Sequence, residues 1–410
     1  MNSIVIIGGG HAGAQLCGAL AEAGLGPQVH LVCAEPLPPY QRPPLSKGFL
    51  KSPTEGPQAH RADAWYGSAG IHLHLGDPAL AIDRAGRTVT LQSGTTLPYQ
   101  QLVLATGARA RTLPGLPAGL ANVVALRNLA DATALRERLG RAPSLTVLGG
   151  GFIGLEVAAT ARASGLAVQV IEAQPRLLAR SVSAELADHI LASHRAAGIT
   201  VHLNAKLGAI EHDGQRLQAL SVDGQRLAVD LLLLGIGAEP DHGLAAQAGL
   251  ALDNGIVVDA AMRSSDAAIL AIGDVANFPA AAAWAPAGSR LRLESVQNAN
   301  DQARTAAATL QGREAAYAAL PWFWSEQGSL RLQMAGLMPA ADAPGVARHR
   351  RPGATLSSFS ILHYRGERLV CVESVNAAMD HMLSRKLLEA GKHPAPALAC
   401  DPAAALKSLL

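Results

Sequence analysis

The feature that most constrains the fold is a glycine-rich motif that occurs twice, each time after a short apolar run. Residues 4–7 lead into Gly-Gly-Gly-His-Ala-Gly at 8–13, and residues 145–148 lead into Gly-Gly-Gly-Phe-Ile-Gly at 149–154. Both copies match GxGxxG, whose glycines permit a tight strand-to-helix turn, close approach to a pyrophosphate, and close packing of helix on strand. The repeat predicts two Rossmann-like units and two dinucleotide cofactors.

Each unit continues into a second strand-like run that ends in an acid. Glu35 lies 22 residues beyond Gly13 and Glu172 lies 18 residues beyond Gly154, close to the spacing of about 20 for a ribose-binding carboxylate. The pyrophosphate would face the start of the following helix, where free N–H groups and the helix dipole favour negative charge. One motif alone is also compatible with a glycine-rich turn, but two copies with strands and spaced acids favour nucleotide binding.

Three further apolar runs lead into a glycine, within residues 102–107, 231–237 and 269–274. Buried parallel strands end in this way where a sheet approaches a ligand. Taken alone, each run is equally compatible with a core strand and its turn. With the duplicated motif, they predict an α/β protein with doubly wound parallel sheets.

Composition narrows the classes of function. The chain has 410 residues, of which 49% are hydrophobic and 16% charged, so it can bury a large core. The 34 basic and 32 acidic residues leave a net charge of +2, which argues against nucleic-acid binding as the main function, because that needs a clustered basic excess. The sequence contains no uninterrupted apolar run of about 18 residues, so we expect no membrane span.

The four cysteines, Cys17, Cys33, Cys371 and Cys400, include no CxxC pair. This argues against a redox-active dithiol and against a short-spaced zinc or iron–sulfur site, so no metal site is predicted. The small number of cysteines fits a reducing compartment, and the first residues lack the pattern of a secretory leader. We therefore expect a cytoplasmic protein.

The motifs GGGHAG, RPPLSK, ATG, GGGFIGLE, GIGAEP, AIGD and PWFWSEQ occur in this order. The order resembles that of the FAD-dependent, NADH-dependent ferredoxin reductases that serve bacterial monooxygenases and aromatic-ring dioxygenases. The resemblance covers residues 4 to about 386, and RPPLSK, GFIGLE and PWFWSEQ are more specific than the glycine motifs. It implies FAD and NAD as the two cofactors.

The resemblance implies an α/β fold with two Rossmann-like dinucleotide-binding domains, in the glutathione-reductase-like arrangement, and a C-terminal α+β domain. The FAD-binding domain would comprise residues 1–111 and 239–318. The NAD-binding domain, 112–238, would be inserted into it, and the C-terminal domain would cover 319–410.

Local patterns add detail to this division. Residues 357–363 and 368–374 are predicted to be strands and 377–390 a helix. Residues 280–288 are predicted to form a surface loop, and the Ala/Pro-rich residues 395–410 a loose tail.

Three residues are expected to be catalytic. The resemblance pairs Lys47, in RPPLSK, with Glu156, at the start of the second glycine-motif helix, beside flavin N5, where hydride arrives. It places Trp324 over the flavin region, near the exit for electrons; the family usually has Asp where this chain has Glu326. The simpler alternatives are a solvated loop lysine, a carboxylate favoured by the helix dipole, and an aromatic core residue.

The cofactor-binding residues follow from the motifs, the acidic strand ends and the resemblance. For FAD we expect Gly8, Gly10, His11, Ala12, Gly13, Glu35, Arg42, Lys47, Ala105, Thr106, Gly107, Arg127, Gly273, Asp274, Glu294, Ser295, Val296 and Trp324. For NAD we expect Gly149, Gly151, Phe152, Ile153, Gly154, Glu172, Gly235, Ile236 and Gly237.

The resemblance also gives some of these residues particular roles. It places Arg127 at the adenine-diphosphate end of FAD and Asp274 on the ribityl chain. The helix that opens at Glu294 would face the pyrimidine side of the isoalloxazine, where its dipole stabilises reduced flavin. Other histidines, such as His72 and His74, are expected to be structural or exposed.

The expected function is transfer of hydride from NADH to FAD and of single electrons onward to a small iron–sulfur ferredoxin, which feeds a terminal oxygenase. A monomer or weak dimer is expected. A disulfide reductase of the two-dinucleotide class is disfavoured, because no CxxC follows the first motif. The alternative from another class is a redox-gated NADH-binding flavoprotein of the apoptosis-inducing-factor type, which acts by recruiting a partner.

A basic stretch suggests where an acidic ferredoxin would dock. From residue 321 onward the sequence has ten Lys/Arg and seven Asp/Glu. Arg348, Arg350 and Arg351 cluster in what looks like a loop, and a basic face would steer an acidic partner. An ordinary solvated loop is the simpler alternative.

Overall fold

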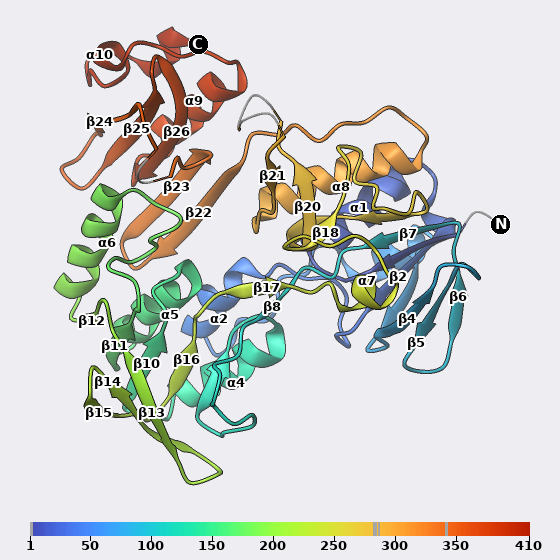
Figure 1. Ribbon diagram of the computed structural model, residues 1–410, viewed down its shortest axis with the longest axis horizontal. Coiled ribbons are helices and arrows are strands. Elements are labelled where there is room, and N and C mark those ends of the chain that lie inside the picture. Colours follow the sequence, from blue (N-terminus) through green and yellow to red (C-terminus); the bar gives the residue numbers. More distant parts are fainter. Residues whose placement is uncertain (1–2, 282–284, 286–287, 341–342) are drawn as a thin grey trace. The chain divides into compact units, whose positions relative to one another are not determined.

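The computed structural model describes residues 3–281, 285, 288–340 and 343–410, and the chain forms two compact units (Figure 1). Unit 1 consists of Met1–Gln41, Pro57–Arg109 and Glu239–Pro321. Unit 2 consists of Arg42–Gly56, Ala110–Ala238 and Trp322–Leu410. Residues 42–56, expected in the FAD domain, belong to unit 2, together with most of the expected NAD and C-terminal domains. The division into three domains stays a prediction. Part of the predicted loop 280–288 lies outside the described residues.

Unit 1 contains a parallel sheet of five strands in the order β19-β7-β1-β2-β3. The strands are β1 (Ile4–Ile7), β2 (Val29–Cys33), β3 (His72–Leu75), β7 (Gln101–Leu104) and β19 (Ile269–Ala271). All four residues of the central strand β1 are buried, which explains why its sequence is continuously apolar rather than alternating. Ile7 is in register with both Val32 and Leu104, so these strands end at the same edge of the sheet.

The other elements of unit 1 surround this sheet. Helix α8 (Val296–Leu310) packs against α1 (His11–Glu22), which follows β1 directly. The shorter helices are η1 (Gly26–Gln28), α3 (Asp63–Ser68), α7 (Gly243–Gln247) and η3 (Gly273–Val275). One small sheet is antiparallel and consists of β4 (Ala79–Asp83), β5 (Thr88–Leu91) and β6 (Thr96–Pro98). The other consists of β18 (Ile256–Val257), β20 (Ala276–Pro279) and β21 (Arg290–Leu291). The strands β8 (Ala108–Ala110) and β17 (Ala238–Pro240) pair with each other.

Unit 2 repeats the Rossmann-like pattern. Its parallel sheet has the order β12-β11-β10-β16-β9. The strands are β9 (Val123–Ala125), β10 (Ser144–Leu148), β11 (Ala167–Ile171), β12 (Thr200–His202) and β16 (Leu232–Leu234). Its other elements are η2 (Pro43–Ser46), α2 (Gly48–Lys51), α4 (Leu129–Leu139), α5 (Phe152–Ala163), α6 (Ala184–Ala196), and the antiparallel sheet of β13 (Leu207–His212), β14 (Leu217–Val222) and β15 (Gln225–Ala228).

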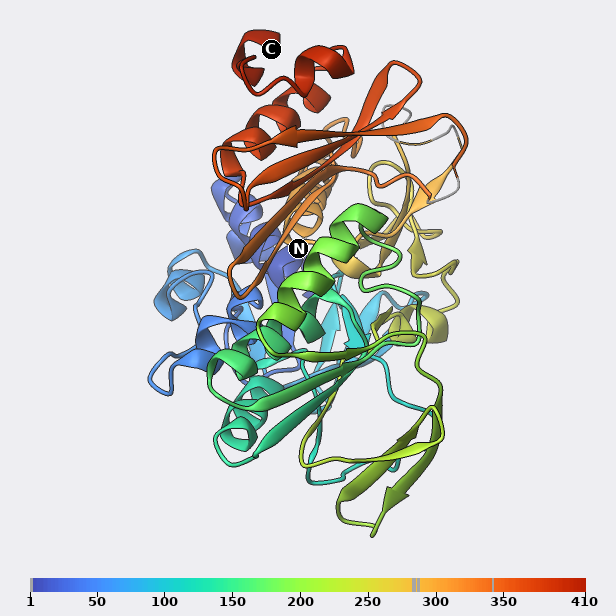
Figure 2. The same cartoon turned by 90° about the vertical axis from the view of Figure 1, so that its left-hand side faces the viewer.

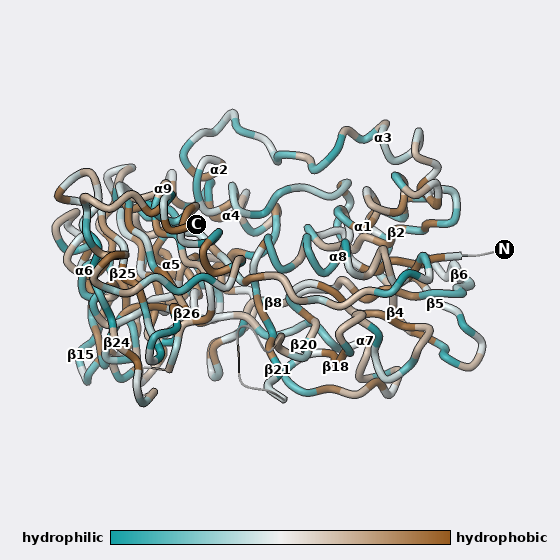
Figure 3. Tube along the Cα trace, turned by 90° about the horizontal axis from the view of Figure 1, so that it is seen from above, coloured by the Kyte–Doolittle hydropathy of each residue, from teal (hydrophilic) through white to brown (hydrophobic). Residues whose placement is uncertain are grey.

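Both parallel sheets confirm the predicted α/β class. The hydropathy trace in Figure 3 shows apolar segments along strands such as β2, in agreement with the buried residues of that strand. Among the described residues, no helix combines the length and the apolar character needed to cross a membrane.

The C-terminal part of unit 2 is an antiparallel sheet in the order β22-β23-β26-β25-β24. The strands are β22 (Trp322–Gln327), β23 (Leu330–Gly336), β24 (Val346–Pro352), β25 (Phe359–Arg365) and β26 (Arg368–Val375). Helix α9 (Ala378–Glu389) covers one face, and α6 lies on the other, where His189 contacts Phe359 (Figures 1 and 2). The α+β expectation for this part of the chain is therefore confirmed.

Two local expectations were wrong. Residues 395–410 are not a loose tail: they form α10 (Pro396–Ala399) and η4 (Leu406–Leu409), and Leu406 is buried. The three arginines do not lie in a loop but on β24, where successive side chains point to opposite faces. Arg348 and Arg350 are exposed, whereas Arg351 is buried and donates to the carbonyls of Ala399, Asp401 and Ala404.

Candidate functional site

The first glycine motif forms the turn between β1 and α1 in unit 1. Gly8 has a φ of 120°, and a Cβ there would lie 2.2 Å from the Ala105 carbonyl oxygen. A Cβ at Gly13 would lie 2.0 Å from the Gly8 oxygen. A Cβ at Gly10, by contrast, would meet no described atom within 4 Å. Packing therefore explains the first and third glycines, whereas the open space at Gly10 fits close approach of a pyrophosphate to the start of α1.

Other predicted FAD residues gather around this motif. A Cβ at Gly273, which has a φ of 78°, would lie 3.1 Å from the Cβ of Ala12, so this strand end lies beside the start of α1. Asp274 follows it in η3. On the neighbouring strand end, Ala105 N donates to Ile7 O at 2.8 Å, and Thr106 Oγ1 donates to Asp241 O.

The helix predicted near Glu294 begins at Val296. Ser295 is its N-cap and accepts a hydrogen bond from Asn298 N at 3.1 Å. Glu294 is just outside the helix, in an ion pair with Arg292 at 2.6 Å. The predicted helix start is therefore correct to within two residues.

Two residues that support this site were missed from the sequence. Tyr40 donates a hydrogen bond of 2.5 Å to Glu35, the acid that follows β2. Gln302, fully buried in α8, accepts from the Gly273 N–H at 2.7 Å. Neither residue belongs to a motif, because no fixed spacing relates it to its partner and the contact is visible only in the folded chain.

The second glycine motif, in unit 2, reproduces the geometry of the first. Gly149 has a φ of 104°, and a Cβ there would lie 2.4 Å from Gly235 O, just as Gly8 lies against Ala105. At Gly151 the nearest atom to a Cβ is again Gly235 O, 3.7 Å away, so the middle position is open. Ile153, in the first turn of α5, is 44% exposed. The motif leaves open the space that a second pyrophosphate requires, and it leaves an apolar side chain exposed beside that space.

The remaining predicted NAD residues line the same strand edge. Gly154 is buried against β10, and a Cβ there would lie 2.9 Å from Gly149 O. Phe152 contacts Phe323 of β22, with ring centroids 4.5 Å apart. Ile236 packs against the neighbouring apolar cluster, and Gly237 O accepts from Arg111 N at 3.1 Å.

Glu172, at the end of β11, is oriented by the backbone. Its two carboxylate oxygens accept from Gly150 N at 2.6 Å and from Gln174 N at 2.7 Å. Arg176 donates instead to the carbonyls of Ala179 and Val182, both at 2.8 Å. The acid is thus fixed at the edge of the second motif, and the nearest arginine is engaged elsewhere.

The RPPLSK segment is held within unit 2 by arginines. Arg42 Nη1 donates to the Arg127 carbonyl at 2.7 Å, so two residues predicted at the flavin are in contact. Arg136 of α4 donates to the carbonyls of Phe49, Ser52 and Glu55 and lies over the Phe49 ring. These contacts fix the backbone that follows Lys47.

Lys47 and Glu156 form the ion pair that was expected, with 2.7 Å between Nζ and Oε2. The Glu156 side chain is only 6% exposed. It also accepts from Ser46 Oγ at 2.5 Å and from Ser325 Oγ at 2.7 Å, and the Glu326 N–H lies 3.4 Å from Oε1. These donors surround the carboxylate and fix its orientation toward the lysine. Because Glu326 acts through its backbone and its side chain is exposed, its difference from Asp does not alter this arrangement.

Trp324 lies on β22, with its ring centroid 5.8 Å from that of Trp322. Arg385 of α9 lies over Trp322, 5.1 Å from the centroid. Both tryptophans are half-buried.

Several histidine rings of unit 1 contact one another. His72 and His74 stack near His30, and His11 makes an edge contact with His60. Within the described residues, no three His, Cys, Asp or Glu side chains come together as metal ligands. None of the four cysteines forms a disulfide, and three of them are buried.

Two known protein families together match nearly the whole chain. Residues 2–303 match the pyridine nucleotide-disulphide oxidoreductases, and residues 322–410 match the reductase C-terminal domain. The chain belongs to this family of flavoprotein reductases with a C-terminal reductase domain.

Individual relatives narrow the class. The chain is 42% identical to rhodocoxin reductase of Rhodococcus erythropolis over 97% of its own length and 92% of the relative's. It is 39% identical to the ferredoxin–NAD(+) reductase component of the anthranilate 1,2-dioxygenase system of Burkholderia cepacia, over 99% and 98% of the two chains.

Solved structures that resemble this chain belong to the same class of protein. The ferredoxin reductase of the CYP199A2 system from Rhodopseudomonas palustris superposes with a TM-score of 0.93 at 40% identity, over 100% of this chain and 99% of that one. Putidaredoxin reductase, in its covalent complex with putidaredoxin, gives a TM-score of 0.91 at 34% identity, over 100% and 98%.

Proposed function

We propose that this chain is an NADH-dependent ferredoxin reductase that uses bound FAD. The observation that carries the proposal is the pair of dinucleotide cradles, each with an open middle glycine, in a chain without a CxxC dithiol. Bound FAD supplies the step from two-electron to one-electron transfer. The relatives named as ferredoxin reductases support the ferredoxin as acceptor.

The residues of this chain bind and orient the reactants. The starts of α1 and α5 hold the two pyrophosphates, and Glu35 and Glu172 hold the adenosine riboses. Lys47, oriented by Glu156, fixes the charge where hydride is received, and Trp324 lies on the route by which electrons leave. The division into an FAD domain, an NAD domain and a C-terminal domain belongs to this proposal.

The terminal partner and the setting are also proposed. The ferredoxin passes its electrons to an oxygenase, as the system names of the relatives suggest. A reducing, cytoplasmic setting suits a chain whose four cysteines form no disulfide, and a monomer or weak dimer is the proposed working form.

The proposal is tested with purified protein and a panel of small ferredoxins, including one from the same genome. NADH-driven reduction of a ferredoxin at a rate that supports turnover is the expected result. Slow reoxidation of the flavin with every acceptor would instead favour the redox-gated binding protein.

We expect NADH to be preferred over NADPH by at least about tenfold in kcat/KM. Glu172 is oriented by two backbone N–H groups, so a 2′-phosphate would meet a fixed carboxylate, and Arg176 is engaged with two carbonyls. Steady-state kinetics with both nucleotides measure the ratio, and E172S should lower it. Equal use of the two nucleotides by the unmodified protein would overturn this assignment.

We expect added salt to slow ferredoxin reduction severalfold while leaving reduction of a small neutral acceptor nearly unchanged, because exposed charges are screened within about 8 Å at physiological ionic strength. Since Arg351 is buried, the proposed docking charges are Arg348 and Arg350 alone. R348Q/R350Q should raise the KM for ferredoxin. R216Q/R226Q, which removes the same charge from an exposed antiparallel sheet, is the control. Equal KM values for the two double variants would place docking elsewhere.

A further inference from the structure

A series of hydrogen bonds leads from Glu156 to a histidine in another part of unit 2. Ser325 Oγ donates to Glu156 Oε1 at 2.7 Å. Gln327 Nε2 donates to Ser325 Oγ at 3.2 Å, and Gln327 Oε1 lies 2.9 Å from His194 Nε2. We call these four residues the His194–Glu156 series. It joins α6, β22 and α5, and every member is at most 5% exposed.

The hydrogen bonds of the series run in one donor-to-acceptor direction. Ser325 gives its one hydroxyl proton to Glu156, so it can only accept from Gln327; the Gln327 oxygen then faces His194 and requires the proton on His194 Nε2. A reversed amide would offer an oxygen to Ser325, and its single proton would be divided between two acceptors. A proton on His194 Nε2 is thus the tautomer that matches this orientation of Gln327.

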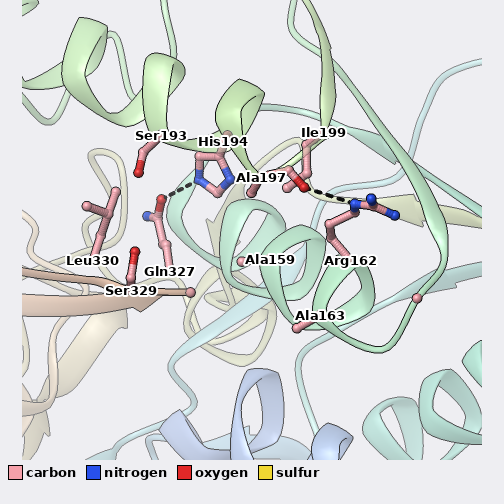
Figure 4. A pocket seen from close by; sticks show the side chains of 12 residues that line it. Ala159, Arg162, Ala163, Ser193, His194, Ala197, Ile199, Gln327, Ser329 and Leu330 are labelled. Carbon is pink, nitrogen blue, oxygen red and sulfur yellow. Dashed lines mark hydrogen bonds between the residues drawn. The ribbon is translucent and has the colours of Figure 1, made fainter.

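The histidine end of the series opens on a pocket of about 360 Å³ between α5, α6 and the β22–β23 turn. Figure 4 shows His194 and Gln327 joined across this pocket, with Ser193 and Ser329 beside them. Burial lowers the pKa of His194, so the ring stays neutral and keeps one N–H and one bare nitrogen. A neutral ring with a fixed tautomer is what the donor-to-acceptor direction of the series requires.

We propose that His194, Gln327 and Ser325 are positioning residues, which hold the Glu156 carboxylate in place for Lys47. The inference rests on the proposed function, in which Lys47 and Glu156 act in the hydride step. Lys47 and Ser46 bind one oxygen of Glu156, while the series binds the other. Loss of the series lets the carboxylate turn and weakens its hold on the lysine.

The test compares three variants by stopped-flow reduction of the FAD-loaded protein with NADH. H194F removes the donor, Q327M breaks the series one step later, and H194Q keeps an N–H donor of similar reach. We expect H194F and Q327M to lower the limiting rate constant about tenfold, the equivalent of one lost hydrogen bond, with an unchanged apparent Kd for NADH. H194Q should recover most of the rate.

A second measurement uses the protein without FAD. The rate at which an amine-acetylating reagent modifies Lys47, followed by mass spectrometry, should rise severalfold in H194F and Q327M and return towards the original value in H194Q. H189F, on the same helix but outside the series, is the control and should change neither measurement.

The outcomes separate the two proposals. If the unmodified protein is not reduced by NADH, the proposed function fails, whatever the variants do. If it is reduced and both H194F and Q327M behave like H189F, the series has no positioning role. If H194F does not fold, Q327M alone decides. Equal loss in H194Q and H194F would also overturn the proposal, because the donor would then not matter.

Discussion

Replacing Glu156 by Gln is expected to slow reduction of the bound flavin by NADH about 10²-fold, the effect typical of losing one preorganised electrostatic contact. Glu156 is the residue on which Lys47, Ser46 and Ser325 converge. An amide of the same size removes the negative charge and presents an N–H to at least one donor, so the lysine loses both its counter-charge and its fixed position.

The measurement is single-turnover bleaching of the flavin at saturating NADH, together with the FAD content of the purified variant. We expect FAD to remain bound, because the residues that form the pyrophosphate cradle of unit 1 are unchanged. E211Q is the matched control: Glu211 forms an ion pair of 2.8 Å with Arg226, but both side chains are about half exposed. An E156Q rate equal to that of E211Q would remove Glu156 from the hydride step.

The parts of the fold that depend on local pattern could be predicted from the sequence. The strand expected at 4–7 is β1 to the residue, and the runs before the second motif and before Thr106 also became parallel strands. Such strands are buried on both faces, so their sequence is a short apolar run ended by glycine. Gly8 and Gly149 could also be identified from the sequence, because each is the glycine that ends such a run. In the structure, their φ values and close contacts tolerate no side chain.

The surroundings of Glu156 could not be predicted in this way. Ser325 lies 169 positions away from it in sequence, and nothing in its immediate neighbours distinguishes it from any serine on a strand. Its partner Gln327 lies on the same strand, and His194, which Gln327 contacts, lies 133 positions from Gln327 in sequence. Only the resemblance linked Lys47 to Glu156; the additional donors became visible once β22 and α5 were placed side by side within unit 2.

For Arg351 the sequence pattern suggested an exposed side chain, whereas the structure shows a buried one. The run Arg348-His349-Arg350-Arg351 is polar throughout, so it resembled a loop, but on β24 its side chains alternate between faces. Arg350 lies over Phe359 and pairs with Glu185. Arg351, on the other face, meets α9 and the C-terminal segment. The burial of a guanidinium was not foreseen because its acceptors are backbone carbonyls, which every sequence has.

Replacing Arg351 by Met is therefore expected to destabilise the protein by roughly 3–5 kcal/mol, the range for breaking a buried charge network. The side chain is 7% exposed; it pairs with Asp380 at 3.2 Å and donates to three carbonyls of residues 399–404, at distances from 2.6 to 3.0 Å. Methionine fills similar space but leaves those carbonyls and the Asp380 carboxylate without their donor. R351K should lie between the two, since an ammonium cannot reproduce the planar fork.

Thermal unfolding of the FAD-loaded protein measures the effect, and a fall in Tm of roughly 10 °C corresponds to this range for a unit of about 200 residues. R350M is the control on the same strand. Its ion pair with Glu185 has partners that are 48% and 41% exposed, and such pairs contribute about 1 kcal/mol or less. A Tm for R351M within one or two degrees of that for R350M would show that the C-terminal segment is held by its apolar contacts, such as Leu406, and not by Arg351. A large gap between the two variants would instead show that alternation along β24 separates a buried structural arginine from an exposed one that contributes little to stability.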